Sequence, residues 1–118
     1  TPAIVAKDGV PLFATGSPGG KTIINTSMQT ILNIIDHGMN IAEAIEAARI
    51  HHQWLPDTTV MEASGISPDT RKLYESYGHT IREVNGIGSA MGVYRDPETG
   101  ILYGGADSRA ADGGAVAY

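Results

Sequence analysis

The residues best suited to chemistry form a glycine-rich stretch near the start of the sequence, Thr15-Gly16-Ser17-Pro18-Gly19-Gly20. An apolar run with helical spacing follows it directly. Glycine lets backbone N–H groups approach a ligand, and a helix N-terminus favours negative charge, so an anion-binding site is one hypothesis for this stretch. It lacks the spacing and the Lys-Ser/Thr ending of a nucleotide phosphate loop. On the pattern alone, a plain strand-to-helix turn is the favoured interpretation.

Two adjacent histidines, His51 and His52, form a second candidate site. Side chains at neighbouring positions diverge on a helix or a strand, whereas metal-binding pairs usually lie four residues apart. We therefore expect no zinc site here. The favoured expectation is one buried, hydrogen-bonded imidazole with Trp54 packed nearby.

Nucleophilic catalysis has two candidates, and the residues around each disfavour it. A triad of Ser17 with His51 or His52 and with Asp36 or Asp57 lacks the Gly-x-Ser-x-Gly elbow. Thr1 could use its own α-amine as general base, as hydrolases with an N-terminal nucleophile do. Pro2 would fix the backbone beside that nucleophile, and the apolar run after it is more typical of the middle of a hairpin.

A second glycine-rich region, Tyr103-Gly104-Gly105-Ala106-Asp107-Ser108-Arg109, precedes the closing stretch from Asp112 to Tyr118. The density of glycine predicts tight turns. Asp107 and Arg109 are compatible with a buried ion pair and equally with a solvated loop.

Composition narrows the possible classes of protein. The 118 residues are 42% apolar and 18% charged, which fits one globular domain over residues 1–118. A net charge of -5, with only eight Lys and Arg, argues against a nucleic-acid partner. The absence of cysteine excludes disulfides and thiolate metal sites. No apolar run approaches the roughly 18 residues that span a bilayer, so we expect no membrane segment.

The elements that must position these residues can be predicted from local signals. Asp8-Gly9 predicts a hairpin over residues 2–15, and a helix should run from the glycine loop to Gly38. Asn40, with Glu43 three residues on, should cap a second helix that continues through Ile50.

The second half of the sequence alternates a helix with strand-like runs. Ser67 and Pro68 predict the start of a third helix that ends at Gly78. Strands are expected at residues 58–61, 79–84, 89–95 and 101–103, the last two as a hairpin. The sequence therefore predicts an α+β fold with helices and strands in separate layers.

Three stretches, in this order along the chain, resemble the γ-glutamyltranspeptidase family. They are Thr15 to Gly20, Arg49-Ile50-His51-His52-Gln53-Trp54-Leu55-Pro56, and Tyr103 to Arg109 with the closing Asp112 to Tyr118. The resemblance covers essentially the whole chain and ends where the family's small subunit ends.

This resemblance implies a partial αββα sandwich of the N-terminal nucleophile (Ntn) hydrolase type. It implies a precursor that cleaves itself into a large and a small subunit, with this chain as the C-terminal part of the small subunit. The nucleophilic Thr, the paired carboxylate-binding serines and the large subunit's Arg would lie outside the chain. The expected partners are the large subunit and the remaining N-terminal segment of the small subunit, and the chain alone should be inactive.

Within the chain, the resemblance assigns the oxyanion hole to the backbone N–H groups of Gly19 and Gly20. Ser17 and Pro18, in the same loop, are the candidate substrate-binding residues. The implied reaction is transfer of a γ-glutamyl group from glutathione or a similar compound to water or an amino acid, with no metal or cofactor. Two alternatives remain: a non-catalytic module that binds γ-glutamyl anions, and an acylase or capsule-processing relative. The resemblance implies a periplasmic or secreted location.

Overall fold

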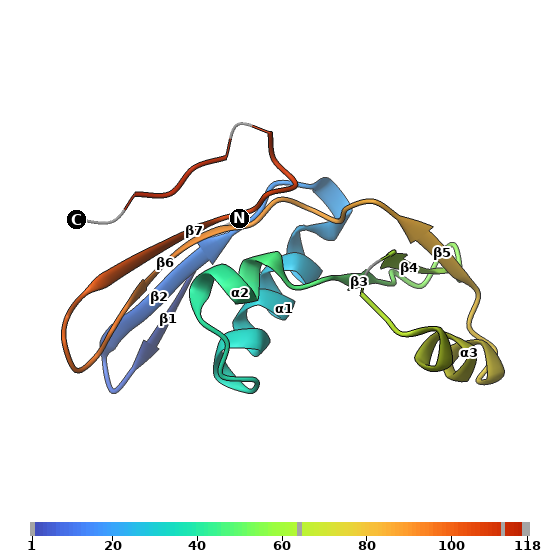
Figure 1. Cartoon of the computed structure of the whole chain (residues 1–118), viewed down its shortest axis with the longest axis horizontal. Helices are drawn as coiled ribbons and strands as arrows, with labels where there is room; N and C mark the ends of the chain where they lie inside the picture. Colours follow the sequence, from blue (N-terminus) through green and yellow to red (C-terminus); the bar gives the residue numbers. More distant parts are fainter. Residues whose placement is uncertain (1, 64, 112, 117–118) are drawn as a thin grey trace. The chain divides into compact units, whose positions relative to one another are not determined.

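The computed structural model describes residues 2–63, 65–111 and 113–116, and the chain forms two compact units (Figure 1). Unit 1 comprises Thr1–Ala47 and Gly88–Tyr118, and unit 2 comprises Ala48–Ile87. The hypothesis about Thr1 lies outside the described residues, as do Asp112, Ala117 and Tyr118 of the closing stretch.

Unit 1 is built on an antiparallel sheet with the strand order β1-β2-β6-β7. The strands are β1 (Pro2–Lys7), β2 (Val10–Gly16), β6 (Met91–Arg95) and β7 (Leu102–Ala106). Both predicted hairpins are confirmed. In the first turn, Asp8 and Gly9 have φ values of 53° and 80°, the left-handed conformation that an Asp-Gly hairpin turn requires.

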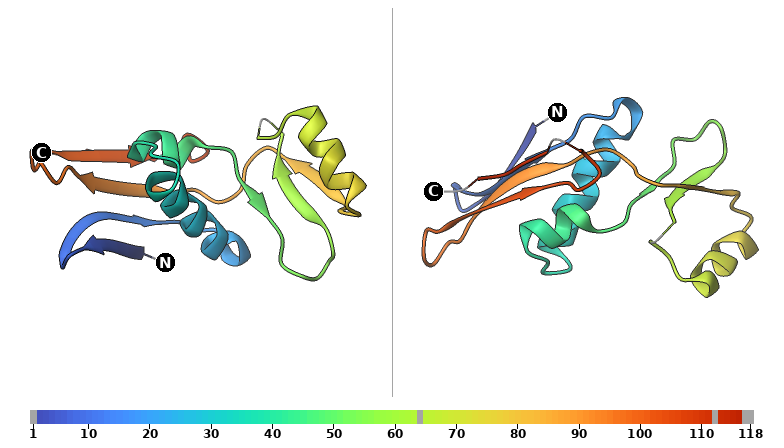
Figure 2. Two further views of the ribbon diagram at one scale, coloured as in Figure 1. Left: turned by 90° about the horizontal axis from the view of Figure 1, so that it is seen from below. Right: turned by 45° about the horizontal axis from the view of Figure 1, so that its top comes forward.

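Helices cover one face of this sheet, as Figures 1 and 2 show. They are the short 3₁₀ helix η1 (Gly20–Thr22), α1 (Ile23–Ile35) and α2 (Ile41–Glu46). The predicted capping box is confirmed: Asn40 Oδ1 accepts the Glu43 N–H at 2.9 Å, and Glu43 Oε2 accepts the Asn40 N–H at 3.0 Å. Gly38, with a φ of 66°, follows α1 as predicted.

The prediction that the second helix continues to Ile50 is wrong. The helix ends at Glu46, and Ala47 takes an extended ψ of 138°. Ile50 and His51 instead form β3, paired with Met61 and Val60. Backbone pairing with a distant strand therefore overrides the helical spacing of the apolar residues.

The core of unit 1 depends on two glycines that face α2. Gly92 and Gly105 are register partners on β6 and β7. A Cβ at Gly92 would lie 2.9 Å from Ile41 Cδ1, and one at Gly105 would lie 2.9 Å from Ile45 Cδ1. A side chain at either position would require Ile41 or the fully buried Ile45 to shift, so glycine lets both pack closely against the sheet.

The other face of the sheet is apolar and open within the described residues. Side chains alternate between the two faces of a strand, so the face away from α2 carries Ile4, Met91, Val93 and Leu102. Ile4 is 72% exposed. Residues 113–116 run along β7 on this face, where Ala115 approaches Gly104. The sheet is thus covered by helices on one side only.

Unit 2 combines antiparallel and parallel strand pairing. Its strands are β3 (Ile50–His51), β4 (Thr59–Glu62) and β5 (Ile81–Val84), in that order. β4 and β5 are parallel, so α3 (Pro68–Ser76) forms the crossover between them. The predicted cap is confirmed, since the Ser67 hydroxyl accepts the Thr70 N–H at 3.3 Å.

A buried carboxylate ties the two ends of unit 2 together. Glu62, 4% exposed, accepts the N–H of Arg49 at 3.1 Å and the N–H of Ile87 at 2.6 Å. The buried guanidinium of Arg49 donates to the Ile87 carbonyl at 2.8 Å. The points where the chain enters and leaves unit 2 are therefore joined by hydrogen bonds made by the side chains of Glu62 and Arg49.

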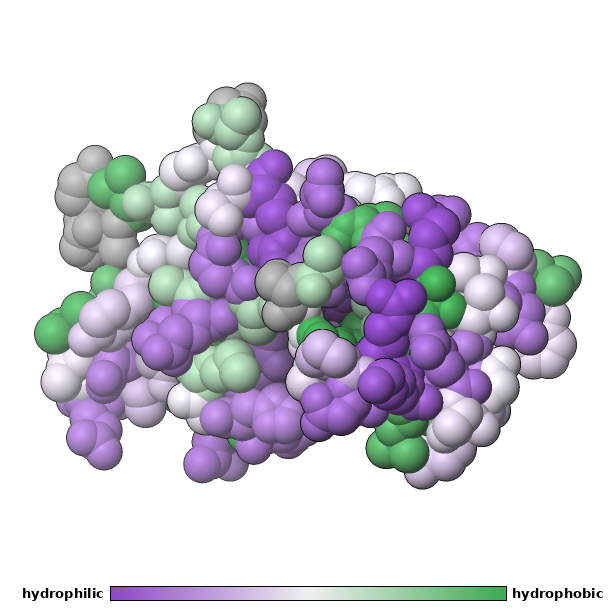
Figure 3. Space-filling view, turned by 45° about the vertical axis from the view of Figure 1, so that its right-hand side comes forward, coloured by the Kyte–Doolittle hydropathy of each residue, from purple (hydrophilic) through white to green (hydrophobic). Residues whose placement is uncertain are grey.

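Several apolar side chains of both units lie at the surface. Figure 3 shows such groups in green, separated by hydrophilic residues, on one side of the molecule. Along α1 the exposed apolar residues recur at helical spacing: Ile24, Met28, Leu32 and Ile35. None of the described helices has the length and apolar character needed to cross a membrane.

Candidate active site

The glycine loop lies between the end of β2 and the start of η1. On its β2 side, Thr15 is 3% exposed and its hydroxyl donates to the Met91 carbonyl at 3.0 Å, which fixes the strand end against β6. Pro18, Gly19 and Gly20 are exposed. The loop therefore has a buried, anchored base and an accessible tip.

Both glycines at the tip adopt backbone conformations that other residues rarely adopt. Gly19 has a φ of 136° and Gly20 a φ of 57°. A Cβ on Gly19 would lie 2.6 Å from Thr22 Oγ1, whereas one on Gly20 would meet nothing within 4 Å. Gly19 is therefore required both for its backbone angle and for its lack of a side chain, while Gly20 is required for its angle alone.

The N–H groups of Gly19 and Gly20 donate to no acceptor among the described residues. The Gly19 carbonyl, in contrast, accepts the Thr22 N–H at 3.2 Å and the Thr22 hydroxyl at 3.0 Å. Two neighbouring donors thus remain available at an exposed tip, next to the positive end of the following helix. This arrangement is suited to stabilising a negatively charged oxygen.

The side chain of Ser17 points into the protein. Ser17 is 3% exposed, and its hydroxyl donates to the Pro18 carbonyl at 2.5 Å and accepts the Ser89 N–H at 3.0 Å. The interaction with Ser89 joins segments 72 residues apart. The substrate-binding role of Ser17 and Pro18 stays a prediction. Sequence reasoning missed Ser89, for which the nearby glycines Gly86 and Gly88 were the only local signal.

Asp107 and Arg109 form a buried ion pair, one of the two alternatives that the sequence allowed for this loop. Arg109 Nη1 lies 2.9 Å from Asp107 Oδ1, and Asp107 is 1% exposed. The guanidinium also donates to the carbonyls of Ile45, Glu46 and Ala47, at the C-terminal end of α2. A cation at this end is favourable because it satisfies carbonyls that have no helical partner.

Ser108, between these two residues, holds the side chain of Glu46. Its hydroxyl and its N–H each donate to the Glu46 carboxylate at 2.7 Å. The bond from the Ser108 hydroxyl, followed by that from its backbone N–H, lowers the pKa of Glu46 below its ordinary value. The segment Asp107–Arg109 thus joins β7 to α2 by charge and hydrogen bonds.

The two histidines lie in unit 2. His51 is buried, with Nε2 3.1 Å from Gln53 Oε1, which confirms one buried, hydrogen-bonded imidazole. His52 Nε2 lies 3.1 Å from Asp57 Oδ1. The expectation that Trp54 packs nearby is wrong, because its side chain is 80% exposed. In the part of the chain that the structure describes, no three His, Cys, Asp or Glu residues cluster as metal ligands.

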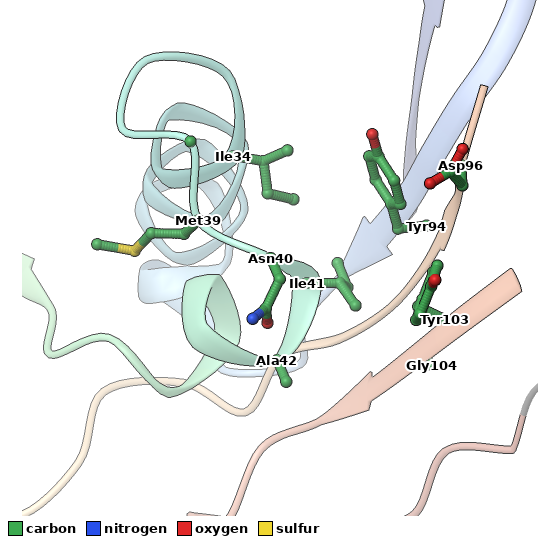
Figure 4. Close-up of a pocket in the computed structure, with 10 residues that line it drawn as sticks. Ile34, Met39, Asn40, Ile41, Ala42, Tyr94, Asp96, Tyr103 and Gly104 are labelled. Carbon is green, nitrogen blue, oxygen red and sulfur yellow. The ribbon is translucent and has the colours of Figure 1, made fainter. Parts of the chain in front are cut away.

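A separate hollow of about 590 Å³ lies in unit 1, at the hairpin end of β6 and β7 (Figure 4). Ile34 and Ile41 line it from the helices, and Tyr94 and Tyr103 from the sheet. Asp96, at its edge, accepts the N–H groups of Thr99 and Glu98, and these bonds lower the pKa of its carboxyl group. The glycine loop is at the opposite end of β2, so the hollow is distinct from the candidate active site.

A sheet with helices on one face and an apolar opposite face is half of an αββα sandwich. This architecture, with a glycine loop at a helix start, is that of the Ntn hydrolases. The family model for gamma-glutamyltranspeptidase matches residues 1–117. The chain belongs to the γ-glutamyltranspeptidase family.

Individual relatives agree with this assignment. The chain is 47% identical over 112 residues to the glutathione hydrolase proenzyme of Escherichia coli strain K12, and the match covers 95% of this chain and 19% of that protein. The T380A mutant of Helicobacter pylori γ-glutamyltranspeptidase superposes with a TM-score of 0.88 at 36% identity, over 93% of this chain and 60% of the solved chain. A cephalosporin acylase from Bacillus halodurans gives a TM-score of 0.89 at 29% identity, over 99% of this chain and 22% of the acylase. The chain thus spans about a fifth of the length of the E. coli relative.

Proposed function

We propose that this chain supplies the oxyanion-stabilising part of the active site of a γ-glutamyltransferase or glutathione hydrolase. The observation that carries the proposal is the pair of N–H groups of Gly19 and Gly20, which donate to no acceptor among residues 2–63, 65–111 and 113–116 and lie at an exposed loop tip beside a helix start. The proposal also requires a nucleophilic Thr from a segment outside this chain, as expected from the resemblance.

In the proposed reaction, the Thr hydroxyl oxygen attacks the γ-glutamyl carbonyl carbon and loses its proton to a base. The carbonyl π electrons move to oxygen, and the resulting negative charge accepts hydrogen bonds from the Gly19 and Gly20 N–H groups. Collapse of this intermediate breaks the C–N bond, and the amine leaves with a proton. Water or an amino acid then attacks the Thr ester and releases the γ-glutamyl group.

The remaining parts of the enzyme are proposed as partners of this chain. A large subunit and the N-terminal segment of the small subunit would supply the nucleophile and bind the substrate's α-carboxylate. Pro18, exposed at the loop tip, and the backbone of Ser17 would contact the γ-glutamyl group beside the oxyanion site. Production as a self-cleaving precursor and a periplasmic or secreted location belong to the same proposal.

An acylase is the alternative activity, because the same oxyanion donors serve any amide. The close superposition with the B. halodurans cephalosporin acylase supports this alternative. The higher identity to the E. coli glutathione hydrolase, 47%, favours the γ-glutamyl substrate. A non-catalytic binding module would use the loop for anions without turnover.

A chimera provides the test. The matched stretch of this chain replaces its counterpart in the E. coli proenzyme, and γ-glutamyl anilide is compared with glutaryl anilide, which lacks the α-amino group. We expect self-cleavage and hydrolysis of the γ-glutamyl substrate, with no turnover in a control whose nucleophilic Thr is replaced by Ala. Preference for the glutaryl substrate would support the acylase. A chimera that cleaves itself and assembles but hydrolyses neither anilide would refute the catalytic role.

A further inference from the structure

The glycine loop is held from behind by a segment that is distant in the sequence. The Ser17 hydroxyl accepts the Ser89 N–H at 3.0 Å and donates to the Pro18 carbonyl at 2.5 Å. The Pro18 carbonyl belongs to the peptide group whose nitrogen is that of Gly19. A single buried hydroxyl therefore orients the peptide that carries one of the two free N–H groups.

Gly88 brings this segment close enough for the contact. It has a φ of 68°, and a Cβ there would lie 2.5 Å from Thr26 Oγ1 and 3.0 Å from Ser17 Oγ. The Cβ position of Gly19 is also only 3.4 Å from Gly88 Cα. The backbone at Gly88 thus packs directly against the glycine loop, and both sides of the contact need glycine.

The segment is anchored on its other side by the buried Asp107. Asp107 Oδ2 accepts the Ala90 N–H at 2.8 Å, and the Ala90 carbonyl accepts the Asp107 N–H at 3.1 Å. Ala90 is fully buried. Ser89 therefore presents its N–H to Ser17 from a backbone that is itself fixed.

We propose that Ser17 is a positioning residue for acyl transfer, and that Ser17, Gly88 and Ser89 form a clamp that aims the N–H groups of Gly19 and Gly20. The catalytic part of this inference rests on the proposed function, whereas the structural link between Ser17 and the peptide that carries the Gly19 N–H does not. The clamp acts through the backbone, so its loss should impair stabilisation of the transition state more than binding of the ground state.

The first experiment uses the whole chain, labelled with ¹⁵N, and needs no activity. Ser17→Ala should remove the protection of the Ser89 amide against hydrogen exchange and lower the order parameters of the Gly19 and Gly20 amides. Thr30→Val is the matched control: it removes another buried hydroxyl, which donates to the Thr26 carbonyl at 3.0 Å within α1. Unchanged Ser89 exchange and glycine order parameters in Ser17→Ala would overturn the clamp.

The second experiment measures kinetics of the same variants in the E. coli chimera. We expect Ser17→Ala to lower kcat by about 10- to 100-fold, less than the loss of a whole oxyanion donor, because both N–H groups remain but are less well aimed. KM should change by less than about twofold. Thr30→Val should lower the melting temperature with kcat retained, and Ser17→Thr, which keeps a hydroxyl, should recover part of the loss.

The outcomes separate the two proposals. A raised KM with unchanged kcat in Ser17→Ala would make Ser17 a ligand-binding residue and overturn the positioning role. Unchanged kcat, with stability lost as in Thr30→Val, would make it purely structural. If the parent chimera cleaves itself and assembles but hydrolyses neither anilide, while the Gly19 amide of the chain still responds to Ser17→Ala, the proposed function is refuted and the clamp is supported as a property of the loop itself.

Discussion

Removal of the Gly20 N–H is the sharpest test of the oxyanion assignment, and the structure decides how it must be done. Pro removes the N–H but fixes φ near −65°, whereas Gly20 has a φ of 57°. Gly20→Pro would therefore rebuild the loop as well as remove the donor. Glycolate at position 20, introduced by peptide ligation, replaces the N–H by an ester oxygen and keeps the conformational freedom of glycine.

The expected magnitude follows from the loss of one donor in a preorganised site. We expect the glycolate variant of the chimera to lose about 10²–10³-fold in kcat, or about 3–4 kcal/mol of transition-state stabilisation, with little change in KM. Gly20→Ala keeps the N–H and places its Cβ in open space, so it bears only the cost of the left-handed conformation, about 1 kcal/mol of stability. It should retain most of the kcat.

The assay compares kcat, KM, self-cleavage and melting temperature of the two variants. An ester also weakens the Gly19 carbonyl as an acceptor of the two bonds from Thr22. Thr22→Val, which removes the hydroxyl bond, measures how much of the effect comes from that source. A glycolate variant that matures normally and retains kcat within about threefold would refute the oxyanion role of Gly20.

Three further predictions concern stability and assembly. Folding lowers the pKa of Glu46, so the ionised Glu46 carboxylate stabilises the fold above the ordinary carboxyl pKa, and this stabilisation is lost as the pH falls through the folded-state pKa. The melting temperature should therefore fall less from about pH 5 to pH 3 in Glu46→Gln than in the parent chain. Gly105→Ala, whose Cβ would lie 2.9 Å from Ile45 Cδ1, should lower the free energy of unfolding by about 1–3 kcal/mol in urea titrations, and an unchanged midpoint would contradict the packing argument. The purified chain alone should hydrolyse no γ-glutamyl anilide and should bind a hydrophobic dye through the open sheet face that carries Ile4. Turnover of the anilide would contradict the first expectation, and a monomer that binds no dye would contradict the second.

The elements predicted well from the sequence are those set by neighbouring residues. The Asp8-Gly9 turn, the capping box of Asn40 and Glu43, and the Ser67 cap each depend on contacts within four residues. Local backbone preferences act before any tertiary contact, so these signals survive in the folded chain.

The features that the sequence did not reveal depend on distant partners. β3 consists of two residues and exists only because Ile50 and His51 pair with β4, and the parallel pairing of β4 with β5 has no local signature. The candidate active site also combines a part that local sequence indicates with a part that depends on distant contacts. Gly19 and Gly20 indicated a loop before a helix, but the contact of Ser17 with Ser89 joins the segments that flank β2 and β6, which only the folded sheet brings together.

The tie that Glu62 makes between the two ends of unit 2 has a consequence for the order of folding. β2 and β6 pair across a long stretch of chain, and closing a flexible loop of about 40 residues costs on the order of 3 kcal/mol in chain entropy. Once the Glu62 carboxylate accepts the N–H groups of Arg49 and Ile87, the ends of unit 2 are already together, and the entropy cost of closing this stretch has already been met. Early folding of unit 2 would then shorten the effective loop between α2 and β6, and Glu62→Gln should slow refolding more than it speeds unfolding.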